Sequence, residues 1–298
     1  MSTMTDPAVT AATDLRDDEE LRRARGRRIN GIARWVLPIA LLALTLFWWH
    51  WVVTVNQIPH YVLPGPMLVA QTLVEDFATL AGSWWITIQV TFMALFLAVT
   101  VGVGLAILFN QSRLVEMSFF PYAVVLQVTP IIAIAPLIFI YVVDINLGLF
   151  TIDAQLVGLL ICAWIVAFFP ILSNTTLGLN SADHNLRDLF SIYGATRWQK
   201  LRYLQLPSAL PYFLGGLRIA GGLSLIGAVV AEFVAGTGGV GSGLAFRILE
   251  SSYRLQIPRM FAALFLIVLT GVAIYLAITW LTHVLLHKWH ESAIKRET

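Results

Sequence analysis

Long apolar segments alternate with shorter polar connections along most of the chain. A bilayer core of about 30 Å is crossed by about 20 helical residues, each rising about 1.5 Å. Segments of this length therefore predict membrane-spanning helices. Six are predicted, at residues 35–55, 85–109, 119–143, 149–172, 217–235 and 260–286. The predicted fold class is an all-α polytopic membrane protein.

Composition agrees with this pattern, because only 12% of the 298 residues are charged and 58% are hydrophobic. A soluble domain carries about 25% charged residues. Residues 1–34 are the polar exception and mix acidic residues with arginines. They predict a cytosolic tail ahead of a transmembrane domain at 35–298. Lipid is therefore an expected partner, and the net charge of only +2 gives no reason to expect nucleic acid.

Lysine and arginine predict the orientation in the membrane. Seven arginines precede residue 35, none lies in 57–84, and the connection 174–216 carries Arg187, Arg197, Lys200 and Arg202. Because cytosolic connections are enriched in these residues, both termini and the connection 174–216 are predicted to be cytosolic. The connection after the fifth span carries Arg247 and Arg254 on the opposite side, against this rule.

The connection 174–216 contains two helical patterns, at 182–193 and 197–205, with Gly194 between them. Glycine adopts positive φ without a steric penalty, so a break is expected there. Pro207 and Pro211 are expected to end the second helix, because proline lacks a backbone N–H. The sequence therefore predicts a cytosolic hairpin with an apolar face.

The motif in this hairpin resembles the EAA loop of permeases from binding-protein-dependent ABC importers. It reads Asp188-Leu189-Phe190, three further residues, Gly194-Ala195-Thr196-Arg197, and then Leu206-Pro207-Ser208-Ala209-Leu210-Pro211. Leu189 and Phe190 are bulkier than the family's small residues, and 143–146 replaces a glycine-containing turn. The resemblance extends from about residue 63 to the C-terminus and is nearest to the branch that imports nitrate, sulfonates, taurine and thiamine or pyrimidine precursors.

The resemblance implies a type I importer permease in the bacterial inner membrane. Its implied partners are two copies of a cytosolic ATP-binding subunit, a second permease subunit (expected to be a second copy of this chain) and an external solute-binding protein. The ATPase would be contacted through 182–207, and the residues implied in coupling are Asp188, Leu189, Phe190, Gly194, Ala195, Arg197, Leu206 and Pro207. The chain has no GxxxxGK[ST] motif, so it is not expected to hydrolyse ATP or to hold a cofactor. ATP and Mg²⁺ would belong to the partner.

Other interpretations remain open. The hairpin is also compatible with a basic helix resting on anionic lipid. The whole chain is alternatively a stand-alone secondary transporter or channel, or a scaffold. A secondary transporter would need an ionisable cluster inside the membrane and often an internal repeat. The sequence has one acid well inside a span, Glu232, and no clear repeat.

Several residues are candidates for the translocation path. Glu232 either lines the path or pairs with a neighbouring helix, since a carboxylate inside a bilayer costs about 3 kcal/mol on insertion scales. The uncharged candidates are Gln89, Gln127, Thr129 and Trp164. Ordinary hydrogen bonding between helices is the alternative for these four. Prolines at 121, 130, 136 and 170 are expected to kink the third and fourth spans.

Two further motifs favour simple structural explanations. Residues 236–241 match GxGxxG but follow a span rather than a strand, so a tight turn is expected instead of a dinucleotide site. His283, His287 and His290 share a helical face without a clear fourth ligand. They are interpreted as interfacial side chains, and no metal site is expected.

Overall fold

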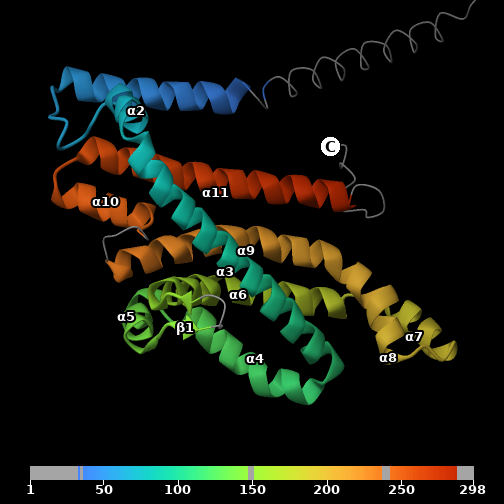
Figure 1. Ribbon diagram of the computed structural model, residues 1–298. Coiled ribbons are helices and arrows are strands. Elements are labelled where there is room, and N and C mark those ends of the chain that lie inside the picture. The colour runs from blue at the N-terminus through green and yellow to red at the C-terminus, as the bar shows by residue number, and fades with distance from the viewer. Residues whose placement is uncertain (1–32, 34–35, 147–150, 237–241, 287–298) are drawn as a thin grey trace, which may run out of the picture. The chain divides into compact units, whose positions relative to one another are not determined.

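The computed structural model describes residues 33, 36–146, 151–236 and 242–286 (Figure 1). The chain divides into two compact units, and the division falls between Leu68 and Val69 in the sequence. The first contains the helix Val36–Val55, which is long and apolar enough to cross a membrane. This confirms the first predicted span. The predicted cytosolic tail lies almost entirely outside the described residues.

The second unit contains the other candidate spans. They are α3 (Phe77–Gln111), α6 (Ala154–Asn180), α9 (Leu206–Ala235) and α11 (Ile257–Leu286). Five described helices are long and apolar enough to cross a membrane, or six if one bent helix pair counts as a span. The predicted all-α polytopic fold is therefore confirmed, with a two-residue antiparallel ladder between β1 (Ile145–Asn146) and β2 (Thr151–Ile152) as a small addition.

The third predicted span is not one straight helix. It consists of α4 (Arg113–Val128) and α5 (Ile131–Tyr141), which are bent by 104° relative to each other. Pro130 causes the break, because it has no N–H to donate and restricts the preceding residue to extended backbone. Thr129 is accordingly extended, with ψ 124°. A bend was expected from the prolines, and the predicted third span over 119–143 corresponds to this bent pair if the two helices cross the membrane together.

The fourth span is displaced towards the C-terminus relative to its prediction. It begins at Ala154, after the β-ladder, and continues to Asn180 instead of ending at 172. Its start is fixed by two carboxylates. Asp153 accepts from the N–H of Gln155 at 2.7 Å, and Asp144 accepts from the N–H of Ala154 at 2.8 Å. Apolar periodicity does not report such capping contacts, which explains the error.

Glycines allow the closest packing in the core, where α6 packs against α3 and α9 (Figure 1). A Cβ added at Gly102 of α3 would lie 2.8 Å from a side-chain carbon of Ile171. One added at Gly227 of α9 would lie 2.8 Å from the Cα of Ala163. Helices in lipid associate mainly by such close contacts, since burial of apolar surface supplies little driving force there.

The expectation that Pro207 and Pro211 end a helix was wrong. The chain runs from α8 (Arg197–Lys200) through the π-helical turn η1 (Leu201–Gln205) directly into α9. The N–H of Leu206 donates to the carbonyl of Leu201, five residues back. This wider turn precedes Pro207, whose ring would crowd the carbonyl four residues back in a regular α-helix. Both prolines therefore lie near the start of a continuous helix.

Three shorter helices complete the described fold. They are α2 (Pro66–Glu75), α7 (His184–Ile192) and α10 (Leu244–Tyr253). Helix α2 ends at Glu75, and α3 begins at Phe77 directly after Asp76. Helix α10 lies beyond the end of α9 that is far from α7 and α8, so these elements mark the two ends of the spanning helices (Figure 1).

Candidate functional site

The first arm of the hairpin, α7, is defined at both ends by local hydrogen bonds. At its start, the Asp183 carboxylate accepts from the N–H groups of Asn185 and Leu186 at 2.8 and 3.1 Å. At its end, Gly194 has φ 68°, and the N–H of Ala195 donates to the carbonyl of Phe190 at 2.9 Å. This is a Schellman ending, for which a left-handed residue is required. The break predicted at Gly194 is confirmed.

The second arm begins with a capping box. Thr196 accepts from the N–H of Gln199 through its hydroxyl, and the Gln199 side chain accepts from the N–H of Thr196. Across the hairpin, Lys200 Nζ donates to the Ser191 hydroxyl at 2.7 Å. These contacts satisfy backbone groups at the helix start and tie the two arms together. The tip of the hairpin is therefore a defined structure.

Arg187 joins the first arm to the spanning helices. Its Nη2 donates to the carbonyl of Leu179 at 3.0 Å, in the last turn of α6. A cation near the C-terminus of a helix satisfies an otherwise unpaired carbonyl and interacts favourably with the helix dipole. Ala182, between α6 and α7, is buried, which also holds the hairpin against the helix end.

An apolar groove of about 320 Å³ lies between the two arms. It is lined by Leu189, Phe190, Tyr193, Ala195, Gln199 and Tyr203. Tyr193 in the groove lining and its chain neighbour Ile192 are 81% and 82% exposed, so a large apolar surface of the hairpin is uncovered.

The groove gathers only part of the predicted coupling set. Leu189, Phe190 and Ala195 line it. Asp188 and Arg197 are exposed on the same hairpin, whereas Leu206 and Pro207 lie at the start of α9 outside the groove. The sequence motif alone did not indicate Gln199 and Tyr203, because they follow Gly194 at positions that meet α7 only after the chain has turned.

Glu232 is held in a closed ring of hydrogen bonds near the end of α9. Its Oε1 accepts from the hydroxyl of Thr87 in α3 at 2.8 Å, and its Oε2 accepts from the N–H of Ala245 at 2.9 Å. The Thr87 hydroxyl in turn accepts from the N–H of Leu244 at 2.9 Å. The carboxylate is 3% exposed and meets the N-terminus of α10, where backbone N–H groups favour an anion.

Gly243 makes this arrangement possible. A Cβ at this position would overlap the carboxyl group of Glu232. The structure therefore places the Glu232 carboxylate between α3, α9 and α10, in contact with groups of the same chain. Gly236, which ends α9 with φ 56°, fits the expected turn, but residues 237–241 of the GxGxxG segment lie outside the described residues.

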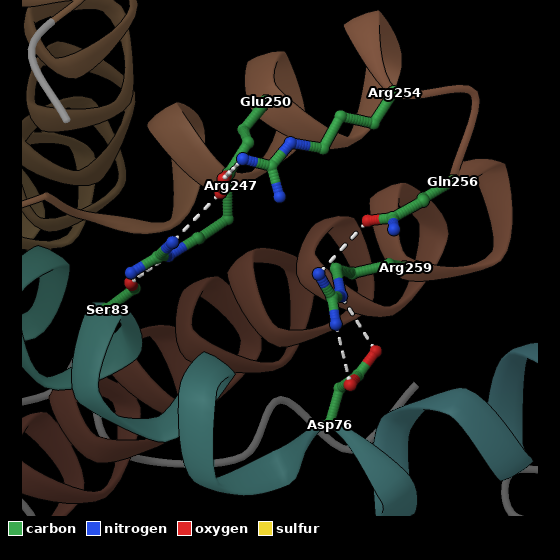
Figure 2. A network of polar contacts seen from close by, with 7 residues as sticks. All are labelled: Asp76, Ser83, Arg247, Glu250, Arg254, Gln256 and Arg259. Carbon is green, nitrogen blue, oxygen red and sulfur yellow. Dashed lines mark hydrogen bonds and ion pairs between the residues drawn. The ribbon is translucent and has the colours of Figure 1, made fainter.

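A second polar network connects α10 and α11 to α3 (Figure 2). Glu250 pairs with Arg247 at 2.9 Å and with Arg254 at 3.0 Å, so the two arginines that conflicted with the charge rule share one carboxylate. Arg247 also donates to the hydroxyl of Ser83 at 2.8 Å. The spacing of these charges by three and four residues is typical of a helix and could have predicted α10.

Asp76 and Arg259 form the other part of this network (Figure 2). The Arg259 guanidinium donates to both carboxylate oxygens of Asp76, each at 2.7 Å. These hydrogen bonds lower the pKa of the Asp76 carboxyl below its ordinary value, against the opposing effect of burial. The two residues are far apart in sequence, so no local pattern could have paired them.

The uncharged path candidates do not gather in one polar cavity. Gln89 and Gln127 are exposed, and the Thr129 hydroxyl donates to the carbonyl of Val125 at 2.6 Å. Trp164 lines an apolar cavity of about 310 Å³ together with residues of α3, α6 and β1. Whether these four residues contact solute stays a prediction. Of the predicted row of histidines, His287 and His290 lie outside the described residues. No cluster that could bind a metal ion is found among the residues that the structure describes.

The fold and the hairpin define a class, that of multi-pass helical transport subunits with a protruding loop between two spans. The family model "Binding-protein-dependent transport system inner membrane component" matches residues 98–288. The chain belongs to this family, and it is a permease subunit of an ABC importer and a multi-pass inner-membrane protein.

Individual relatives agree with this assignment. The chain is 31% identical over 250 residues to a probable ABC transporter permease protein of Haemophilus influenzae, covering 84% of this chain and 96% of that one. It is 32% identical over 260 residues to the riboflavin transport system permease protein of Chloroflexus aurantiacus, covering 86% and 90%. A solved structure of the MetNI methionine ABC transporter in an inward-facing conformation has a similar fold, with TM-score 0.58, 18% identity and coverage of 69% and 95%.

Proposed function

We propose that this permease moves a small solute across the membrane and is driven by a separate cytosolic ATP-binding subunit, which docks on the hairpin at 182–207. The apolar groove between the arms of the hairpin is the observation on which this proposal rests. The proposed solute is a sulfonate, nitrate, taurine or a pyrimidine-type thiamine precursor. ATP and Mg²⁺ are bound by the partner, and this chain supplies no catalytic group.

The surface of the hairpin supports docking to a protein. Ile192 and Tyr193 are almost fully exposed beside a groove of side-chain size. Large apolar and aromatic side chains that surround a concavity are typical of protein interfaces. The Lys200–Ser191 hydrogen bond and the capped helix ends hold the arms in one geometry. A force on the tip is therefore transferred to the spanning helices with little loss through bending.

The proposed assembly contains two permease chains (two copies of this one), two ATP-binding subunits and one external solute-binding protein. Both termini and the hairpin face the cytosol in this proposal. Arg187, Arg197, Lys200 and Arg202 in the hairpin connection, together with the arginines of residues 1–34, support that orientation, whereas Arg247 and Arg254 after the fifth span oppose it.

Substitution of Gly194 tests the coupling role. Gly194 has φ 68° and open space around it, so Gly194→Asp and Gly194→Asn cause similar backbone strain and both fold. Only aspartate adds a charge beside the apolar groove. In the complex purified with its ATP-binding subunit and reconstituted in liposomes, Gly194→Asp is expected to abolish solute-stimulated ATP hydrolysis. Gly194→Asn is the matched control and keeps most of it. Normal transport by Gly194→Asp would overturn coupling through this hairpin.

The orientation has a test of its own. Thr196 is exposed at the tip of the hairpin, and the chain's natural thiol, Cys162, is buried. In the Thr196→Cys variant, a membrane-impermeant maleimide is expected to label the thiol in inside-out vesicles but not in intact cells. Labelling from outside intact cells would place the hairpin on the wrong side for a cytosolic ATPase.

A further inference from the structure

Arg218 is a charged residue in the interior of a spanning helix. It lies on α9 and is exposed, and its neighbour Gly221 packs against Ile274 and Ile278 in the middle part of α11. Among the described residues, the other charged side chain within α9 is Glu232 near its C-terminal end, which is already hydrogen-bonded within the chain. Charged residues inside spans are costly and usually have a functional partner.

The guanidinium of Arg218 has no anionic partner among the described residues. Its contact is with the ring of Tyr275, whose centroid lies 5.5 Å from the guanidinium carbon. A ring against one face stabilises the cation and restricts its orientation. No hydrogen bond from its five N–H donors is found among the described residues. The side chain is therefore held in place while its hydrogen-bonding capacity is unused by the described residues.

The face of α9 that carries Arg218 has room for a ligand. A Cβ added at Gly215 or at Gly222 would meet no atom within 4 Å, and Ile219 and Ile226 are 52% and 56% exposed. The opposite face of α9 is buried against α6. In the proposed homodimer, a symmetric contact would bring the same surface of each copy together. Two guanidinium groups would then approach each other, and an anion between them would relieve the repulsion.

We propose that Arg218 binds an oxyanion group within the membrane. In the proposed importer, on which this part of the inference rests, the oxyanion belongs to an anionic solute such as a sulfonate or nitrate in the translocation path. A planar, permanently charged guanidinium suits such groups, because two parallel N–H donors match two oxygens. A lipid phosphate has the same chemistry and is the other source of the ligand.

Thermal unfolding of the purified full-length permease in neutral detergent tests the site. Sodium nitrate and sodium ethanesulfonate are compared with sodium chloride at equal ionic strength, and phosphatidylglycerol is compared with phosphatidylcholine. At least one oxyanion is expected to raise the unfolding midpoint of the wild type. Arg218→Gln is expected to raise the half-saturating concentration about tenfold or more, which corresponds to the loss of one charge-assisted hydrogen bond.

Matched variants separate the site from general effects of charge. Arg254→Gln removes an exposed arginine directly after α10 and is expected to respond like the wild type. Tyr275→Phe keeps the ring and is also expected to keep the response. Arg218→Lys keeps the charge but not the planar fork, so a weakened response is expected. It also provides the test if Arg218→Gln does not fold.

Each outcome decides the inference. A response to nitrate or ethanesulfonate that Arg218→Gln loses supports a solute site, whereas a response to phosphatidylglycerol alone that it loses supports a lipid phosphate. If Arg218→Gln responds to every anion as the wild type does, or if the wild type responds to none, the inference is overturned. No ATP-binding subunit is present in this measurement, so its failure is distinguishable from a failure of coupling at Gly194.

Discussion

Glu232 offers a test that separates the function of a charge from the function of a hydrogen-bond acceptor. In Glu232→Ala, the N–H of Ala245 loses its acceptor in a buried position. The Thr87 hydroxyl also loses its acceptor but can turn to the carbonyl of Ser83, which lies 3.3 Å away. In Glu232→Gln, the amide oxygen replaces Oε2, and the amide nitrogen can donate to Thr87. Glutamine therefore preserves the ring without the charge.

The structure sets the size of each effect. One buried donor without a partner costs about 1–3 kcal/mol, and the void left by the missing side chain adds to this in Glu232→Ala. Glu232→Gln keeps both ends of the ring connected, so its cost is expected to stay below about 1 kcal/mol. Because Ala245 lies in the first turn of α10, the loss in Glu232→Ala is expected to loosen α10 in particular.

Two measurements check this prediction in the full-length permease. Thermal unfolding is expected to show a lower midpoint for Glu232→Ala than for Glu232→Gln and the wild type, and hydrogen exchange is expected to be faster in α10 of Glu232→Ala alone. Equal stability of all three proteins would refute the hydrogen-bonded ring as a stabilising element. Loss of transport in a fully stable Glu232→Gln variant would instead assign Glu232 to the translocation path, the alternative that the sequence left open.

Two further predictions concern packing and pH. Gly102→Ala is expected to destabilise the fold by about 1–3 kcal/mol relative to Gly104→Ala, measured by thermal unfolding, because its new Cβ meets the buried, β-branched Ile171 while Gly104 has open space. The helix propensity gained is the same in both, so equal midpoints would contradict the close contact. The lowered pKa of Asp76 means that its pairing with Arg259 stabilises the protein above the ordinary value of 3.8 and that this contribution is lost as pH falls below it. Asp76→Asn is expected to remove this acid-dependent part of the stability curve, and an unchanged curve would contradict it.

Apolar segment length was sufficient to predict the spanning helices. It gave no information on how a segment bends, because α4 and α5 are as apolar together as a straight span would be. Pro130 indicated a bend, but the presence of a proline does not give the size of the angle, which is 104°. The prolines at 207 and 211 caused the opposite error. Local rules treat proline as a helix end, and the π-helical turn that accommodates Pro207 has no clear sequence signature.

The residues of the candidate site also differ in how well the sequence predicts their contacts. Gly194 and the capping residues around it act through local hydrogen bonds, so the hairpin could be predicted from neighbouring residues. The partners of Glu232 could not, since Thr87 is far away in sequence and Ala245 belongs to a different helix. Among the residues that the structure describes, Arg218 has no anionic partner, which is likewise a property of three-dimensional packing and not of the local sequence.

The π-helical turn at the base of the hairpin sets the direction in which the hairpin points around the axis of α9. Each residue of an α-helix rotates the chain by about 100° around the helix axis. A turn that holds one additional residue therefore rotates the preceding hairpin by about 100° relative to α9. Deleting one residue from Leu201–Gln205 would leave α9 unchanged but would point Leu189 and Phe190 about a quarter-turn away from their present direction. In the proposed importer, the direction from which the ATP-binding subunit approaches therefore depends on these five residues, one of which, Tyr203, also lines the groove.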